Sequence, residues 1–149
     1  MSTIFKTWTI TAVSVGEEPL QLLCDDRPLR QSQPGTLDDV SPVQHLLLAV
    51  AGCFALSCRA VLQRRTAPLP RFEVHVSGHK LRGGGNRLSH IAVTAVFPTL
   101  SEAEARITAH EAEALCTVTS TLSGSPALSF TVRSDQAVDP DVERVLSRG

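Results

Sequence analysis

The sequence predicts one α+β domain in which strands and two long helices share a hydrophobic core. The chain has 149 residues, 42% of them hydrophobic, which suits a single domain with its own core. Two capping boxes, at Ser41 and Ser101, mark helix starts. Runs rich in β-branched residues lie before, between and after those helices, as strands do. Residues 1–149 are therefore taken as one domain, with 135–149 as a C-terminal extension.

Charge and composition exclude several classes of partner. The net charge is −1, from 14 basic and 15 acidic residues, so nothing favours nucleic acid or a membrane surface as a partner. The N-terminal residues lack a basic segment followed by an apolar one, so no secretory signal is predicted. We therefore expect a cytoplasmic protein whose four cysteines are thiols. No C-x-x-C pair or dinucleotide motif is present, and no cofactor or metal is expected.

The N-terminal segment predicts a β-hairpin followed by a loop. Residues 7–15 are β-branched and roughly alternating, residues 16–19 contain Gly and Pro, and residues 20–24 are again largely apolar. Residues 25–40 hold prolines, a glycine and several polar side chains. They predict a loop, and a loop of this length inside a compact domain is often functional.

The first helix is predicted to run from Ser41 to about residue 65. Pro42 suits the first helical position, and Gln44 completes a capping box with Ser41. Residues 46–56 carry no polar side chain, so this helix has no wet face and must be surrounded by protein. The run is shorter than the roughly 18 to 20 apolar residues of a membrane span. Because one small sheet covers only one side of the helix, we predict a homodimer in which a second subunit covers the other.

The second half of the chain predicts another hairpin and another helix. The alternating residues 72–76 and the strand-like residues 91–97 would form the hairpin, joined by the glycine turn 83–86. A strand and not a helix follows those glycines, so they are not expected to bind phosphate. The second helix should begin at Ser101 and reach residue 115, with a bent continuation to Leu122.

The remaining elements are a last strand and a short tail. Residues 128–132 are predicted to close the sheet, and Asp139 with the proline after it could start a short helix. His75 and His79 stand four apart on a strand, roughly 13 Å from each other, so they cannot share a metal. Both are expected to be solvated.

Cys53 and Cys116 are the best candidates for chemistry. A free cysteine is most often a small buried hydrophobe. Gly52, however, costs a helix roughly 0.5 to 1 kcal/mol relative to Ala and allows close approach of a backbone or ligand beside Cys53. With Cys116 at the end of the second helical stretch, this favours a thiol pair. Cys58, about 140° round the helix from Cys53, is expected to be a packing residue, and Cys24 a bystander or a third thiol.

Two segments resemble a known family. Residues 41–54, which open with Ser41 and Pro42 and contain Gly52 and Cys53, resemble the first-cysteine helix of the OsmC/Ohr family, the osmotically induced and organic-hydroperoxide-resistance proteins. Residues 116–122 resemble the second-cysteine segment, and the order of elements fits over about residues 10–134. The resemblance implies an OsmC-like fold, with antiparallel sheets wrapped around long central helices in an intertwined homodimer.

The same resemblance implies thiol-dependent peroxidase chemistry. Cys53 would attack the O–O bond of an organic hydroperoxide, and Cys116 would attack the resulting sulfenic acid to form a disulfide, which an external dithiol reduces. A thiol in apolar surroundings needs a nearby cation to ionise. The family supplies an arginine from the segment before the first helix, and here Arg30 is the predicted residue, with Arg27 as the alternative.

Two positions depart from the family pattern. Val43 stands where peroxidase members carry a glutamate that orients the arginine, and Thr117 stands where the family usually places Pro. These departures favour a less characterised OsmC-like branch. The alternatives to a peroxidase are therefore a redox-sensing or small-molecule-binding protein with little turnover, and a protein in which both cysteines only pack.

Overall fold

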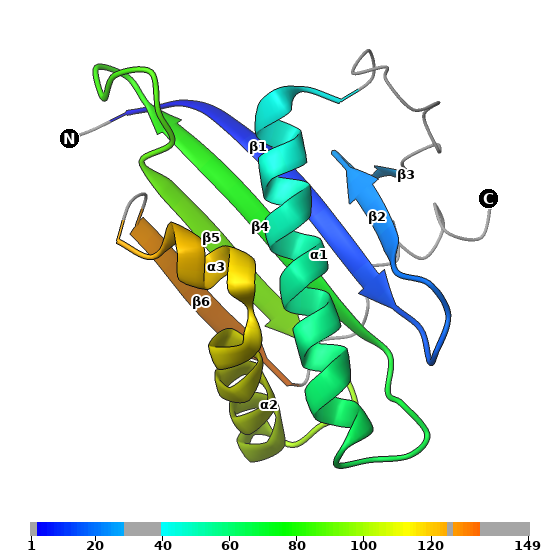
Figure 1. The fold of residues 1–149 in the computed structure, drawn as a ribbon. Helices are drawn as coiled ribbons and strands as arrows, with labels where there is room; N and C mark the ends of the chain where they lie inside the picture. Colours follow the sequence, from blue (N-terminus) through cyan, green and yellow to red (C-terminus); the bar gives the residue numbers. More distant parts are fainter. Residues whose placement is uncertain (1–2, 29–39, 125–126, 135–149) are drawn as a thin grey trace.

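The computed structural model describes residues 3–28, 40–124 and 127–134, which form one sheet with helices on one of its faces (Figure 1). The strands are β1 (Ile4–Ser14), β2 (Gln21–Cys24), β3 (Arg27–Pro28), β4 (Phe72–Leu81), β5 (His90–Val96) and β6 (Ala127–Arg133). The helices are α1 (Pro42–Gln63), α2 (Glu102–Leu115) and α3 (Thr117–Leu122). The predicted α+β class is confirmed. The predicted tail helix at residue 139 lies outside the described residues.

The six strands follow the order β3-β2-β1-β4-β5-β6. Four neighbouring pairs are antiparallel, and β5 and β6 are parallel. The expectation of a purely antiparallel sheet is therefore wrong at one edge. The physical reason is the connection, because α2 and α3 carry the chain back along the sheet before β6 begins, as a crossover between parallel strands requires.

Both predicted hairpins are present. Residues Val13 and Ile10 of β1 face Gln21 and Cys24 of β2, and β4 pairs with β5 through a turn in which Gly83 and Gly85 have positive φ. The predicted loop 25–40 instead opens with a tight turn, since Asp25 and Asp26 adopt φ of 49° and 62° and lead into β3. Short polar side chains such as Asp tolerate this left-handed conformation.

Helix α1 begins where its capping box predicts. The Ser41 Oγ accepts a hydrogen bond from the Gln44 amide at 3.2 Å, and the Gln44 Oε1 accepts one from the Ser41 amide at 2.8 Å. One face of α1 packs on the sheet, where Leu47 lies so close to Gly78 that a Cβ there would be 3.0 Å from it. Among the described residues α1 is the one helix long and apolar enough to cross a membrane by composition, and half of that window is buried inside the fold.

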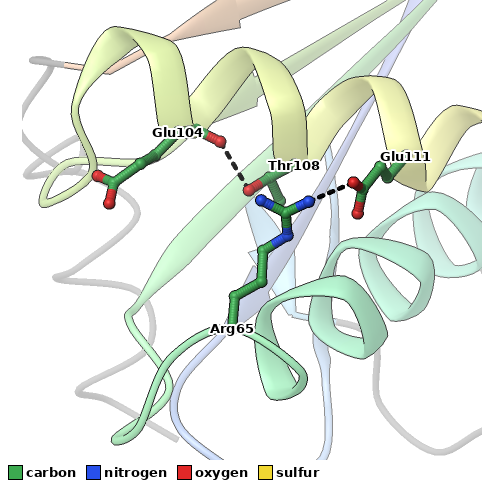
Figure 2. A network of polar contacts seen from close by, with 4 residues as sticks. All are labelled: Arg65, Glu104, Thr108 and Glu111. Carbon is green, nitrogen blue, oxygen red and sulfur yellow. Dashed lines mark hydrogen bonds and ion pairs between the residues drawn. The ribbon is translucent and has the colours of Figure 1, made fainter.

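The second helical stretch is bent, as predicted. Ser101 caps α2 with Glu104 in a second capping box, and Cys116, with φ −77° and ψ 103°, separates α2 from α3. Figure 2 shows how α2 meets the end of α1, where Arg65 forms an ion pair with Glu111. Both side chains are more than two-fifths exposed, so this pair adds at most about 1 kcal/mol of stability.

The sheet face opposite the helices carries a polar network. Thr11 faces His75 across β1 and β4, with 3.2 Å between the threonine Oγ1 and the imidazole Nδ1. The His75 Nε2 lies 2.9 Å from the Glu73 Oε2, and the Thr7 Oγ1 lies 3.0 Å from the His79 Nδ1. Both histidines are partly exposed, in line with the expectation, and the strand register also brings each one opposite a threonine.

Candidate active site

Cys53 lies on the side of α1 that faces away from the sheet. Its side chain is half-buried, and Leu46, Ala49 and Leu56 on the same helical face are exposed because spacings of three and four residues share a face. A Cβ added at Gly52 would meet nothing within 4 Å. Cys53 therefore sits in an apolar stripe, and no contact among the described residues explains the glycine beside it.

Cys116 occupies the break between α2 and α3 and is fully buried. Burial raises the pKa of its thiol, hydrogen bonds to Thr119 partly offset that rise, and the hydrogen bond that its S–H donates to Cys53 raises the pKa again. The Thr119 Oγ1 also donates to the Cys116 carbonyl at 3.4 Å. The structure thus brings together the two cysteines that the sequence singles out, one from each helical stretch.

Cys58 is fully buried in the same core as Cys116, which confirms the prediction that it packs. Burial raises the pKa of its thiol above the ordinary range, and the proximity of Cys116 adds to the rise. This second neighbour of Cys116 was not anticipated, because the distance between Cys58 and Cys116 depends on how α1 and α2 pack and not on sequence spacing.

The segment before α1 holds the candidate arginines. Arg27 lies on β3, exposed, opposite Cys24. Burial raises the pKa of Cys24 and the charge of Asp25 raises it further, while Arg27 lowers it. Arg30 lies outside the described residues. Of the two arginines, the structure therefore places one, and it places that one beside a different thiol, Cys24.

The start of α1 is tied to the β2–β3 turn. The Gln44 Nε2 donates to the Asp25 Oδ2 at 3.3 Å, and the Thr9 Oγ1 donates to the Asp25 Oδ1 at 3.2 Å. Val43 is partly buried and packs against the core. Gln44 therefore caps the helix and also anchors the turn that leads to Arg27, whereas Val43 offers no polar group to an arginine.

A groove of about 440 Å³ lies between α2, α3 and β6. Its walls include His110, Glu113, Ser120 and Thr119, and its lining also includes Leu128 and Phe130. Thr119 contacts Cys116. The Phe130 ring lies 5.4 Å from the ring of Phe54, the residue after Cys53. The groove thus approaches the thiol pair from the side of α3. Sequence analysis missed it, because its walls come from segments that only the fold assembles.

No metal centre accompanies these thiols in the part of the chain that the structure describes. Across residues 3–28, 40–124 and 127–134, no three His, Cys, Asp or Glu side chains gather as metal ligands would. The chemistry that this arrangement supports directly is exchange between neighbouring sulfur atoms.

Comparison with solved structures shows what the fold resembles. An organic hydroperoxide resistance protein from Elizabethkingia anophelis aligns with a TM-score of 0.53 at 19% identity, over 90% of this chain and 99% of that one. OhrB of Bacillus subtilis aligns with a TM-score of 0.51 at 17% identity, over 85% and 97%. An OsmC-like protein from Mycoplasma pneumoniae aligns with a TM-score of 0.54 at 20% identity, over 87% and 96%. At these identities the likeness concerns the fold.

Sequence comparison assigns the family. No curated protein matches the chain significantly. The family model described as OsmC-like protein matches residues 35–131, a range that contains α1, both predicted active cysteines and the strand pair between them. Together with the OsmC and Ohr folds of the solved structures, this match shows that the chain belongs to the OsmC-like protein family.

Proposed function

We propose that this protein is a thiol peroxidase that reduces organic hydroperoxides through Cys53 and Cys116. The observation that carries the proposal is the contact between the two thiols, one half-buried at a helix surface and one fully buried behind it. A peroxidase of this kind needs one accessible sulfur to meet the peroxide and a second sulfur within bonding reach. The Cys53 and Cys116 positions meet both requirements.

The chemistry balances in three steps. The Cys53 thiolate attacks the outer oxygen of the hydroperoxide, the O–O bond breaks, and the alcohol leaves with a proton while Cys53 becomes a sulfenic acid. The Cys116 thiol then attacks the Cys53 sulfur and gives its proton to the departing hydroxide, so that water leaves and a disulfide forms. An external dithiol then reduces this disulfide, is itself oxidised to a disulfide, and restores both thiols.

The surroundings of Cys53 favour an apolar substrate. Leu46 and Leu56 are 39% and 54% exposed and lie on the same face of α1 as Cys53. An aliphatic hydroperoxide can lose apolar surface against these side chains at about 25 cal/mol per Å². Hydrogen peroxide gains nothing from them, so an organic hydroperoxide is the proposed substrate.

The same stripe supports a homodimer. A stripe of exposed apolar side chains along a central helix is costly in water, and a second copy of α1 would cover part of it. Gly52, beside which the described residues leave open space, would let the two helices approach closely, while the uncovered part of the stripe stays open to a hydroperoxide at Cys53. The homodimer thus explains a glycine that no contact among the described residues explains.

A redox-sensing protein with little turnover is the second candidate, and Val43 is the observation that favours it. Activation of Cys53 is proposed to come from Arg30 or Arg27, but Val43 packs against the core and cannot hold a guanidinium in place. A poorly held arginine would leave the Cys53 thiolate less stabilised and its attack on peroxide slow.

Thiol counting with disulfide mapping tests the proposal. We expect one equivalent of cumene hydroperoxide to consume two thiols per chain within seconds to minutes, and peptide mapping to find the Cys53–Cys116 bond. Slow consumption over hours with the same bond would favour the sensor. A dominant Cys24–Cys53 bond, or four unreacted thiols, would refute the assignment of the pair.

A further inference from the structure

We infer that the groove between α2, α3 and β6 is the site at which a small dithiol reductant reaches the oxidised pair and attacks Cys116. The inference rests on the proposed function, since it concerns the disulfide that the function requires. It adds a binding site for the second substrate, on a different side of the thiol pair from the apolar stripe of α1.

The first argument is the direction of attack. In thiol–disulfide exchange the attacking, attacked and leaving sulfurs lie nearly in line, so Cys116 must be attacked from the side away from Cys53. Cys53 contacts Cys116 from α1. Cys116 also contacts Thr119, and Thr119 lines the groove. A thiolate in the groove would therefore approach Cys116 past the Thr119 side chain.

The second argument is access. Cys116 has no exposed surface of its own, so a reductant cannot attack it from open solvent. In Figure 1, α2 and α3 lie beside α1 on the side where β6 forms the edge of the sheet. The groove is lined by residues from both sides of the break between these two helices, Ala114 of α2 and Thr119 of α3. Displacing the Thr119 side chain would expose the sulfur without unfolding α1.

The third argument is the chemical character of the walls. A volume of about 440 Å³ lies within the size range of small-molecule sites. Leu128 and Phe130 offer an apolar surface for a short aliphatic chain, and Ser120 and Glu113 offer hydrogen-bonding partners at the rim. The carboxylate of Glu113 opposes an anionic reductant. The walls therefore suit a neutral or cationic aliphatic dithiol.

The reduction balances without another reactant. One reductant thiolate bonds to the Cys116 sulfur, the Cys53–Cys116 bond breaks, and Cys53 leaves as a thiolate. The second reductant thiol attacks its own sulfur in this mixed disulfide, and Cys116 leaves as a thiolate. The reductant departs as a disulfide, and its two protons stay with Cys53 and Cys116.

The test separates the two half-reactions. Ala114→Phe and Ser120→Phe each fill the groove from an exposed helix position, and Ala103→Phe places the same ring on α2 outside the groove. The disulfide is made with diamide and its reduction by 1,4-butanedithiol and by dithiothreitol is followed by thiol release. Oxidation of the reduced proteins by cumene hydroperoxide is timed separately.

We expect both groove variants to slow reduction about tenfold, with oxidation and the Ala103→Phe control within about twofold of the parent protein. Reduction at the parent rate in both variants, or equal slowing of oxidation and reduction, would overturn the groove assignment. Should either variant fail to fold, the parent protein still decides, because its reduction rate must saturate with 1,4-butanedithiol and a strictly linear dependence excludes a site.

The two proposals fail in different ways. A disulfide that diamide forms but hydroperoxide does not would refute the peroxidase function and leave the reduction experiment intact. Absence of the Cys53–Cys116 bond after diamide would refute both.

Discussion

The two ends of the thiol contact lie in opposite surroundings. Cys53 is half-buried on α1 among exposed apolar side chains, whereas Cys116 is fully buried in a helix break and hydrogen-bonded to Thr119. A sulfur that meets substrate needs an open approach, and one that acts second must not be oxidised first. Burial and the raised pKa of Cys116 keep it as an unreactive thiol. The difference in burial therefore supports the proposed order of reaction, in which Cys53 reacts first.

The largest expected effect concerns removal of either sulfur. Cys53→Ser should lower hydroperoxide turnover at least about 100-fold, because no other thiol lies on the apolar face of α1. Cys116→Ser should still allow one fast oxidation of Cys53 but block the disulfide. Mass spectrometry should then find sulfenic acid on Cys53, trapped with dimedone. Fast turnover in Cys53→Ser would reverse the assigned order.

The next effect concerns the apolar face itself. We expect a dimer of the 16.0 kDa chain, burying more than roughly 2,000 Å² as obligate dimers do. Leu56→Glu should convert the dimer to a monomer or unfold it. Analytical ultracentrifugation measures the mass and shape of the resulting species. Ile4→Glu is the control, because Ile4 is 53% exposed against 54% for Leu56 but lies on β1.

Gly52→Ala distinguishes a dimer from a monomer by whether it raises or lowers the free energy of unfolding. In an isolated chain the added methyl meets none of the described residues within 4 Å, so Ala should stabilise α1 by about 0.5 to 1 kcal/mol. Where a second helix crosses at Gly52, the methyl should destabilise the protein instead. Chemical denaturation at two protein concentrations measures the sign, and stabilisation together with a monomeric mass would remove the homodimer.

A smaller effect is expected at the start of α1. Val43→Glu should speed the first oxidation about tenfold at pH 7, since a carboxylate could hold the arginine that stabilises the Cys53 thiolate. The gain should vanish in an Arg30→Ala background, where the carboxylate only repels the thiolate. Stopped-flow rates for the parent protein and the three variants form the cycle. A gain that survives Arg30→Ala but not Arg27→Ala would move the role to Arg27.

Local features of the fold could be predicted from the sequence because their causes are local. The caps at Ser41 and Ser101 involve side chains three residues apart, so both helix starts agree with the structure. The bent continuation beyond residue 115 was also predicted, and the structure has the bend at Cys116. Contacts of this kind need no knowledge of the rest of the chain.

Features that depend on tertiary packing could not be predicted. The parallel pairing of β6 depends on the crossover, and the histidine network depends on the register of β1 against β4. For the candidate site, the glycine beside Cys53 and the family resemblance suggested Cys53 with Cys116. Neither indicated the approach of Cys58 to Cys116 or the groove. The pairing of Arg27 with Cys24 depends on the left-handed turn at Asp25.

The last prediction concerns Cys58, the buried thiol that the mechanism does not use, and its effect appears only at alkaline pH. Burial raises the pKa of the Cys58 thiol in the folded protein. At a pH between the ordinary thiol pKa and this raised pKa, Cys58 is therefore deprotonated in the unfolded chain but still protonated in the folded one. The stability linked to this group is fully present below about pH 8.5 and falls by about 1.4 kcal/mol per pH unit above it.

Cys58→Ala should remove this decrease in stability between about pH 8.5 and 10.5. Val61→Ala, at another buried position of α1, is the control. It should lower the free energy of unfolding about as much as Cys58→Ala does, but it should keep the dependence of that free energy on pH. Urea unfolding across that pH range measures the free energy of unfolding of both variants. If its pH dependence is unchanged in Cys58→Ala, Cys116 and Cys24 account for the stability that is lost at alkaline pH.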